Sequence, residues 1–317
     1  MLVAIVRGEE DSGQATGHDS GKNWKDDKPD AQKMLDQVAW TSEEFAVTWT
    51  AVAGRDYQRL VRFPTPHPSG DERNDWVSME WYMPTAKSDA AIPTVVVIHE
   101  SGSAMPAGRA IARGIRQMGL NAILLHLPYY GERRGPQKRE MSEFLLTMRQ
   151  GVADARRAFY AVAALPGVDA QRISLQGTSL GGFVATSAAS LDACYFQTFI
   201  MLAGGDLHSM ILNGKHDTAK LRDQLAKAGY EGDKLRELLD QVEPTRLAHR
   251  LPPDRTWLYA ALQDDVVPIQ NARRLADAIP LEKPHRLELV GGHYTAALWL
   301  PLVIAHFSQH ARGTAEK

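Results

Sequence analysis

Hydrophobic and polar positions follow two different rhythms along the chain, and the change comes near residue 94. Before it, three runs rich in aromatic and β-branched residues are separated by loops, the later of which are rich in proline and glycine; the runs are 45–49, 57–63 and 76–82. This pattern predicts a small antiparallel meander. Residues 8–36 show no apolar periodicity, so we expect residues 1–38 to form a disordered or loosely draped segment.

After residue 94, continuous apolar runs alternate with segments of helical spacing. The runs predict buried strands at 94–99, 121–127, 172–176, 196–202, 257–262 and 285–290. Helices are expected between and after them, at 109–118, 142–164, 180–190, 268–279 and 295–310. The rhythm stops over about residues 206–250, where two short amphipathic patterns predict a helical cap. The alternation predicts one α/β domain over residues 39–317: a doubly wound, mostly parallel sheet with an antiparallel start and a small helical cap.

The composition and net charge limit the class of protein but do not indicate a binding partner. Of the 317 residues, 44% are hydrophobic and 23% are charged, and the formal net charge is -2. These values are ordinary for a globular protein and give no indication of a nucleic-acid partner. No run approaches the ~20 apolar residues of a membrane span. Cys194 is the only cysteine, which excludes an intrachain disulfide and a thiolate-rich metal site. As it stands the chain is expected to be cytoplasmic, or exported if the true start lies upstream with a signal peptide.

One short motif at the junction of a predicted strand and a predicted helix carries chemistry. Gly177-Thr178-Ser179-Leu180-Gly181 matches the pattern G-x-S-x-G. A serine at such a junction lies on a strained turn, and only glycine fits easily two residues before it and two residues after it. The turn would expose the Ser179 hydroxyl and aim the Leu180 amide at the space where an oxyanion forms. A helix cap at Ser179 would need no flanking glycines.

A serine nucleophile needs a base and an orienting acid, and two later strand ends supply candidates. One strand is followed by Gln263-Asp264-Asp265, and the last strand is followed by Gly291-Gly292-His293. Reacting groups in such sheets lie past the carboxyl ends of the strands, where these residues would meet Ser179. The order Ser179, Asp264, His293 is the order expected for an elbow of this kind. Asp264 or Asp265 could instead cap the following helix.

These three pieces resemble the α/β-hydrolase superfamily over about residues 75–310. The likeness is strongest to its serine esterase branch, which includes acetyl-esterases, dienelactone-hydrolase-like enzymes and the catalytic domains of prolyl-oligopeptidase-type peptidases. In that family the acid stands four residues before a proline, here Pro268, which selects Asp264 and leaves Asp265 as a helix cap. The resemblance implies a catalytic triad of Ser179, His293 and Asp264, with no metal ion and no organic cofactor.

The resemblance also implies an oxyanion hole with two backbone donors. The Leu180 amide would be one, and an amide of Glu100 or Ser101 would be the other. The family commonly shows His-Gly-Gly in this loop, whereas the present chain has His99-Glu100-Ser101. Because a carboxylate facing a developing oxyanion is unfavourable, we expect the Glu100 side chain to point away or to pair with an arginine. His99 is expected to be a structural hydrogen-bonding residue of the loop.

Two further segments could shape the pocket. Tyr129, Tyr130 and Arg133 follow a strand end, so they could border the substrate on its leaving-group side. The alternative is a turn braced by glycine and proline, with a surface Arg–Glu pair. The trio Met210-Ile211-Leu212 could line an acyl pocket, although such a trio is more often core.

Hydrolysis of a small-molecule carboxylic ester through an acyl-serine intermediate is therefore the predicted function. The alternatives are a peptidase or amidase of the same fold, and a non-catalytic binding domain. A serine elbow argues against dehalogenase and epoxide-hydrolase reactions, for which this fold carries aspartate. His99-Glu100 begins like the zinc motif H-E-x-x-H, but position 103 is serine.

Overall fold

The sheet at the centre of the molecule has an antiparallel part and a parallel part. The computed structural model describes residues 12–19, 24–85, 90–136 and 140–313. Within these ranges ten strands form one sheet in the order β1-β2-β3-β4-β6-β5-β7-β8-β9-β10. The strands are β1 (Gly13–His18), β2 (Glu44–Ala51), β3 (Arg59–Pro64), β4 (Trp76–Tyr82), β5 (Ile92–Ile98), β6 (Asn121–Leu125), β7 (Val168–Thr178), β8 (Thr198–Met201), β9 (Thr256–Ala261) and β10 (Arg286–Leu289).

Strand direction changes at the contact between β4 and β6. The pairs β1–β2, β2–β3, β3–β4 and β4–β6 are antiparallel. The pairs from β6–β5 through β9–β10 are parallel. The predicted α/β sheet with an antiparallel start is confirmed. Its parallel strands bring the carboxyl ends of β5, β6, β7, β9 and β10 to one edge, where loops can meet.

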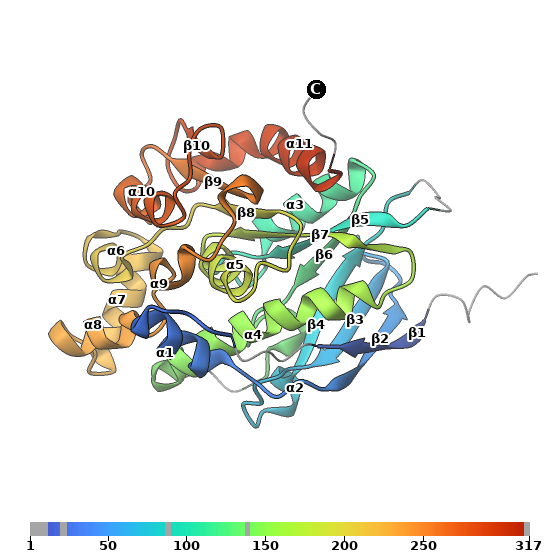
Figure 1. Cartoon of the computed structure of the whole chain (residues 1–317), viewed down its shortest axis with the longest axis horizontal. Helices are drawn as coiled ribbons and strands as arrows, with labels where there is room; N and C mark the ends of the chain where they lie inside the picture. The colour runs from blue at the N-terminus through green and yellow to red at the C-terminus, as the bar shows by residue number, and fades with distance from the viewer. Residues whose placement is uncertain (1–11, 20–23, 86–89, 137–139, 314–317) are drawn as a thin grey trace, which may run out of the picture.

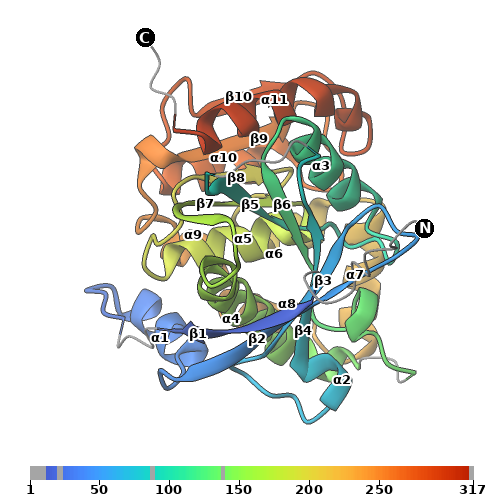
Figure 2. The same cartoon turned by 90° about the vertical axis from the view of Figure 1, so that its right-hand side faces the viewer.

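Helices cover both faces of the sheet, as Figures 1 and 2 show. One face packs against α1 (Pro29–Val38), α4 (Phe144–Ala163), α5 (Leu180–Ser190), α9 (Thr245–Ala248) and α10 (Ile269–Ala278). The other face packs against α3 (Pro106–Gln117) and α11 (Leu300–Ala311). Short helical turns occur at α2 (Glu72–Asp75), η1 (Gly131–Arg133), η2 (Met141–Glu143), η3 (Pro253–Arg255) and η4 (Thr295–Trp299).

Burial on both faces explains why the central strands are continuous apolar runs. In β5, Val96 and Ile98 belong to the core under α4 and α5, whereas Val95 and Val97 belong to the core under α3 and α11. Successive side chains of a strand point to opposite faces, so a strand covered on both sides must be apolar at every position.

The N-terminal prediction was wrong where the structure can test it. Residues 13–18 form β1, which pairs antiparallel with β2, and residues 29–38 form α1. Two glycines of this segment serve close packing, because a Cβ at Gly13 would meet the ring of Trp49 and a Cβ at Gly17 would meet the ring of Phe45. The buried positions of α1 have helical spacing: Ala31, Met34, Leu35 and Val38. Residues 1–11 and 20–23 lie outside the described residues.

The predicted cap over residues 206–250 is helical. It contains α6 (Leu207–Asn213), α7 (Asp217–Lys227) and α8 (Gly232–Asp240), which lie together at one end of the molecule in Figure 1. These helices share a separate apolar cluster with the start of α4 and with Val266 and Val267. The fourth helix, α9, packs on α5 and α10 instead. Among the described helices, none has the length and apolar character that crossing a membrane requires.

Candidate active site

Ser179 lies on the tight turn between β7 and α5. Its backbone is at φ 52° and ψ −116°, and its amide donates a hydrogen bond to the Met201 carbonyl at 2.8 Å. Both flanking glycines are required by close backbone contact. A Cβ at Gly177 would collide with the Gly181 carbonyl, and a Cβ at Gly181 would collide with the Ile98 carbonyl. The turn is therefore a strained conformation that the surrounding backbone holds in place.

A continuous hydrogen-bonded chain links Ser179 to His293 and Asp264. The Ser179 Oγ lies 3.1 Å from His293 Nε2, and His293 Nδ1 lies 2.7 Å from Asp264 Oδ2. The second carboxylate oxygen, Asp264 Oδ1, accepts hydrogen bonds from the amides of Val266 at 2.9 Å and Val267 at 2.8 Å. With Nδ1–H donated to the carboxylate, Nε2 is the free acceptor for the serine hydroxyl. The arrangement can remove a proton from Ser179.

Asp265 follows Asp264 in the sequence, but its side chain faces His216 and not His293. Its Oδ2 lies 3.3 Å from His216 Nε2, and its side chain is 41% exposed. Its predicted role as a helix cap was wrong, because α10 begins after Pro268 without a side-chain cap. The structure thus brings Asp264, and not Asp265, to His293.

The paired glycines before His293 allow its loop to turn close to the end of β9. Gly291 has φ 122°, a conformation that favours glycine, and its amide donates to Gln263 Oε1 at 2.6 Å. A Cβ at Gly292 would lie 3.2 Å from the Gln263 carbonyl oxygen. The Gly292 amide donates to Thr295 Oγ1 at 2.8 Å. These contacts hold the histidine loop next to the loop that carries Asp264.

The Glu100 carboxylate caps helix α3. It accepts hydrogen bonds from the amides of Ala107 at 2.9 Å and Gly108 at 3.0 Å, in the first turn of that helix. The positive end of the helix dipole favours a carboxylate there. The side chain therefore points away, as expected, and its partners are backbone amides and not an arginine.

Ser101, in the loop after β5, and Leu180, at the start of α5, belong to one cavity. Both line it together with Ser179. Leu180 is the first residue of α5, so its amide has no carbonyl partner one turn earlier in the helix. The Leu180 amide is thus available in the region of the serine hydroxyl.

His99 and Tyr130 hold the Ser101 loop in place. His99 is fully buried; its Nε2 accepts from the Leu127 amide at 3.1 Å, and its Nδ1 donates to the Glu100 carbonyl. Burial lowers the pKa of His99 to about 3, so the ring is neutral. Tyr130 packs on that ring at 4.7 Å between centroids and donates its hydroxyl to the Ser101 carbonyl at 3.1 Å. The geometry supports the expected structural role of His99.

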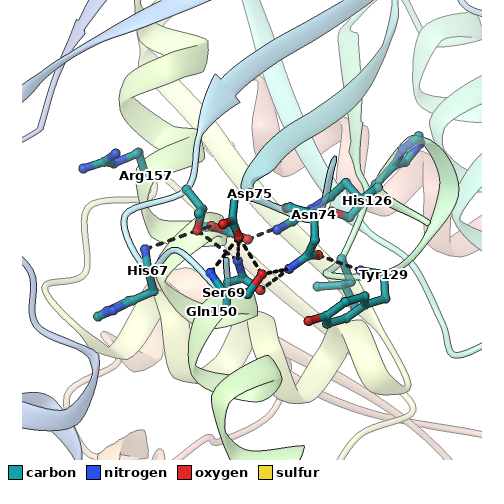
Figure 3. A network of polar contacts seen from close by, with 12 residues as sticks. His67, Ser69, Asn74, Asp75, His126, Tyr129, Gln150 and Arg157 are labelled. Carbon is teal, nitrogen blue, oxygen red and sulfur yellow. Dashed lines mark hydrogen bonds and ion pairs between the residues drawn. The ribbon is translucent and has the colours of Figure 1, made fainter. Parts of the chain in front are cut away.

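Tyr129 and Arg133 lie outside the residues that line the cavity. The Tyr129 amide donates to Asn74 Oδ1 at 2.9 Å, in the polar network of Figure 3. Arg133 is fully buried; its Nη1 lies 2.7 Å from Asp154 Oδ2, and its Nε donates to the Asn74 carbonyl at 2.8 Å. The prediction of Arg133 as a substrate contact was wrong, because the ion pair with Asp154 holds its guanidinium in the interior.

The cavity has a volume of about 430 Å³ and lies between α4, α5, the cap helices and the loop after β9 that carries Asp264. Met210 and Ile211 line it and are buried in the cap cluster, whereas Leu212 is 51% exposed. Phe183 lines the cavity one turn beyond Ser179. Sequence reasoning missed Phe183, although its position four residues after the nucleophile was a usable signal. Among the described residues, no three His, Cys, Asp or Glu side chains are arranged to hold a metal ion.

Known proteins resemble this chain in sequence and in structure, although no protein-family model matches it. Esterase YjfP of Escherichia coli K12 is 23% identical over 197 residues, which are 62% of this chain and 78% of that protein. The putative esterase YitV of Bacillus subtilis 168 is 24% identical over 212 residues, which are 63% of this chain and 81% of that protein. An acetyl xylan esterase from Paenibacillus sp. R4 superposes with a TM-score of 0.61 at 15% identity, covering 87% of this chain and 92% of that one.

The structural match shows the fold of this chain. The two sequence relatives show that the chain is similar to proteins named esterases. Both agree with the motif resemblance found in the sequence. The chain has the α/β-hydrolase fold and resembles the serine esterase branch of that superfamily.

Proposed function

We propose that this protein is a serine hydrolase that cleaves a carboxylic ester through an acyl-serine intermediate. The observation that carries the proposal is the chain of hydrogen bonds from Asp264 through His293 to Ser179, which ends at an apolar cavity. The esterase names of YjfP and YitV support the choice of an ester.

In the first half-reaction, His293 Nε2 accepts the hydroxyl proton while Ser179 Oγ attacks the ester carbonyl. Asp264 holds the imidazole in the required tautomer and stabilises its positive charge. The Leu180 amide and an amide of the loop at Ser101 donate to the oxyanion, in a site that partly excludes water. The protonated His293 then gives its proton to the departing alcohol.

Water completes the reaction by attacking the acyl-serine. His293 Nε2 accepts a proton from that water, the second oxyanion forms at the same donors, and the carboxylic acid leaves. Ser179 regains its proton from His293. Each step uses side chains and amides of this chain.

Labelling with a fluorophosphonate probe tests the proposal directly. We expect one adduct at Ser179 by peptide mapping, and no adduct in Ser179→Ala. That variant should lose roughly a millionfold in turnover of p-nitrophenyl acetate, as loss of a triad serine does in other hydrolases. Absence of labelling at Ser179, together with unchanged ester hydrolysis in Ser179→Ala, would refute the proposal.

The same assay separates the ester proposal from the two alternatives. An anilide with the same acyl group as the ester should not be cleaved at a measurable rate, whereas a peptidase or amidase would hydrolyse it readily, even if it cleaves the more reactive ester faster. A non-catalytic binding domain would neither label nor cleave either compound.

A further inference from the structure

We propose that the acyl group accepted by this site is an apolar chain of medium length, held in the cavity under the cap, and that Met210 limits its length. This inference rests on the proposed function, because it requires Ser179 to be the nucleophile. It goes further by assigning a substrate class and a residue that determines specificity.

The first argument is size. The cavity holds about 430 Å³, within the range of roughly 300–1,000 Å³ that buries most of a drug-sized ligand. An acetyl group has three heavy atoms, and a single water takes up about 30 Å³ of liquid. An acetyl ester would therefore leave most of the cavity unoccupied.

The close packing of protein interiors indicates what kind of ligand would occupy this space. Protein interiors are close-packed, and an apolar void costs stability because its lining loses contacts. Here the cavity, which is open to solvent on one side, adjoins the apolar cluster that joins α6, α7 and α8 to the start of α4. A ligand with an apolar chain would restore the missing contacts.

The second argument is the chemistry of the walls. Apolar side chains from α4, α5, α6, the end of α8 and the loop after β9 line the space: Phe144, Phe183, Met210, Leu239, Val242 and Val267. The charged side chains that line it, Asp217 and Lys220, are 47% and 76% exposed and lie 2.9 Å apart. Because these charges pair with each other at the solvent side, the interior offers a chain no charged partner and favours an apolar one.

The third argument is position. Ser179, Leu180 and Ser101 line the same cavity as Met210. An ester whose carbonyl lies at the serine and the backbone donors can therefore extend its acyl chain toward α6 and α8. Met210 is buried on α6, and methionine is a flexible side chain that adapts to a chain of variable shape. Because Met210 lines the cavity, its side chain takes up room that a longer chain would need.

The experiment compares kcat/KM for p-nitrophenyl acetate, butyrate, octanoate and palmitate. Wild type should prefer octanoate over acetate by roughly tenfold or more, because each methylene in an apolar pocket contributes to discrimination. Met210→Trp, which fills the cavity, should lower the octanoate-to-acetate ratio by roughly tenfold. The matched control is Leu212→Trp, two residues along the same helix and 51% exposed, which should leave the ratio unchanged.

A second variant keeps the test decisive if Met210→Trp does not fold. Met210→Ala enlarges the cavity and should shift preference from octanoate toward palmitate. A wild type that prefers acetate, or ratios that neither Met210 variant changes, would overturn the inference. The proposed function would survive that outcome if Ser179 still labels and Ser179→Ala still abolishes acetate hydrolysis. Loss of both would instead overturn the proposed function.

Discussion

Two aspartates of this protein hold basic partners at the same distance, with different consequences. Asp264 lies 2.7 Å from the imidazole of His293, and Asp154 lies 2.7 Å from the guanidinium of Arg133. The first pair continues to Ser179 and the cavity. The second pair is closed off from solvent, since both side chains are fully buried, and Arg133 also donates to the carbonyls of Asn74 and His126.

The closed region belongs to a larger polar network between α2, the loop after β3 and α4. Figure 3 shows Asn74, Asp75 and Gln150 linked there by hydrogen bonds. The Asp154 carboxylate additionally accepts from Thr65 Oγ1. Polar groups that satisfy each other inside the protein stabilise one arrangement, whereas a chain that ends at open space can act on a ligand. The two regions differ in where the series of hydrogen-bonded partners ends. The series through Asp264 ends at the cavity beside Ser179, and the series through Asp154 ends inside the protein.

The largest expected effect falls on the open region. Asp264→Asn should lower turnover by roughly ten thousandfold, because an amide no longer holds the reactive tautomer of His293. Stability should change little. Asp265→Asn is the matched control and should keep most of the turnover, since Asp265 faces His216. Steady-state kinetics on one ester measures both variants; equal losses would show that the two acids act together.

The next prediction concerns the buried pair of Arg133 and Asp154. A substitution there should lower stability and leave turnover unchanged, the reverse of Asp264→Asn. Arg133→Met should lower the free energy of unfolding by about 3–5 kcal/mol, because it leaves Asp154 buried without its partner. Turnover per folded molecule should remain. The control Arg62→Met removes an exposed arginine 3.8 Å from Glu132 and should change stability by less than about 1 kcal/mol. Urea unfolding measures both variants. If the Arg133→Met protein is as stable as wild type but has a lower turnover, Arg133 acts in catalysis and not in stability.

The smallest effect concerns acid stability near His126. Burial would raise the pKa of Glu80, but hydrogen bonds from His126 and Arg109 outweigh it and hold the pKa at about 2, against an ordinary value of 4.5. A lowered folded-state pKa contributes stability above the unfolded-state pKa, and this stability is lost as the pH falls toward 2. The contribution is about 3 kcal/mol at neutral pH, of which about 2 kcal/mol is lost by pH 3.

Glu80→Gln should therefore have a flatter acid limb than wild type. Urea unfolding at pH 7 and pH 3 measures the slope. Glu288→Gln changes a carboxylate near the surface whose pKa is also lowered by its pair with Arg273, and it should flatten the slope less than Glu80→Gln does. If Glu80→Gln and wild type lose the same free energy between the two pH values, the ion pair of Glu80 does not control acid stability.

Local sequence patterns were sufficient for the parallel strands and for the tight turn at Ser179. The β-branched run of β5 predicted a strand buried on both faces, and the sheet confirms it. The N-terminal segment was mispredicted because it lacks apolar periodicity, and the contacts of Gly13 and Gly17 with rings of β2 are invisible in a linear pattern. Arg133 was misplaced for a similar reason, since nothing in its own loop indicates a partner on α4.

The sequence by itself determined the features that depend on neighbours along the chain. Glycines on both sides of Ser179 and two glycines before His293 prescribe turns through backbone sterics alone. Tertiary structure decided the rest: that Glu100 caps α3, that Arg133 lies in the interior, and that about 430 Å³ remains open beside Ser179. These features depend on how helices and strands far apart in the chain pack together, and packing is a property of the whole fold.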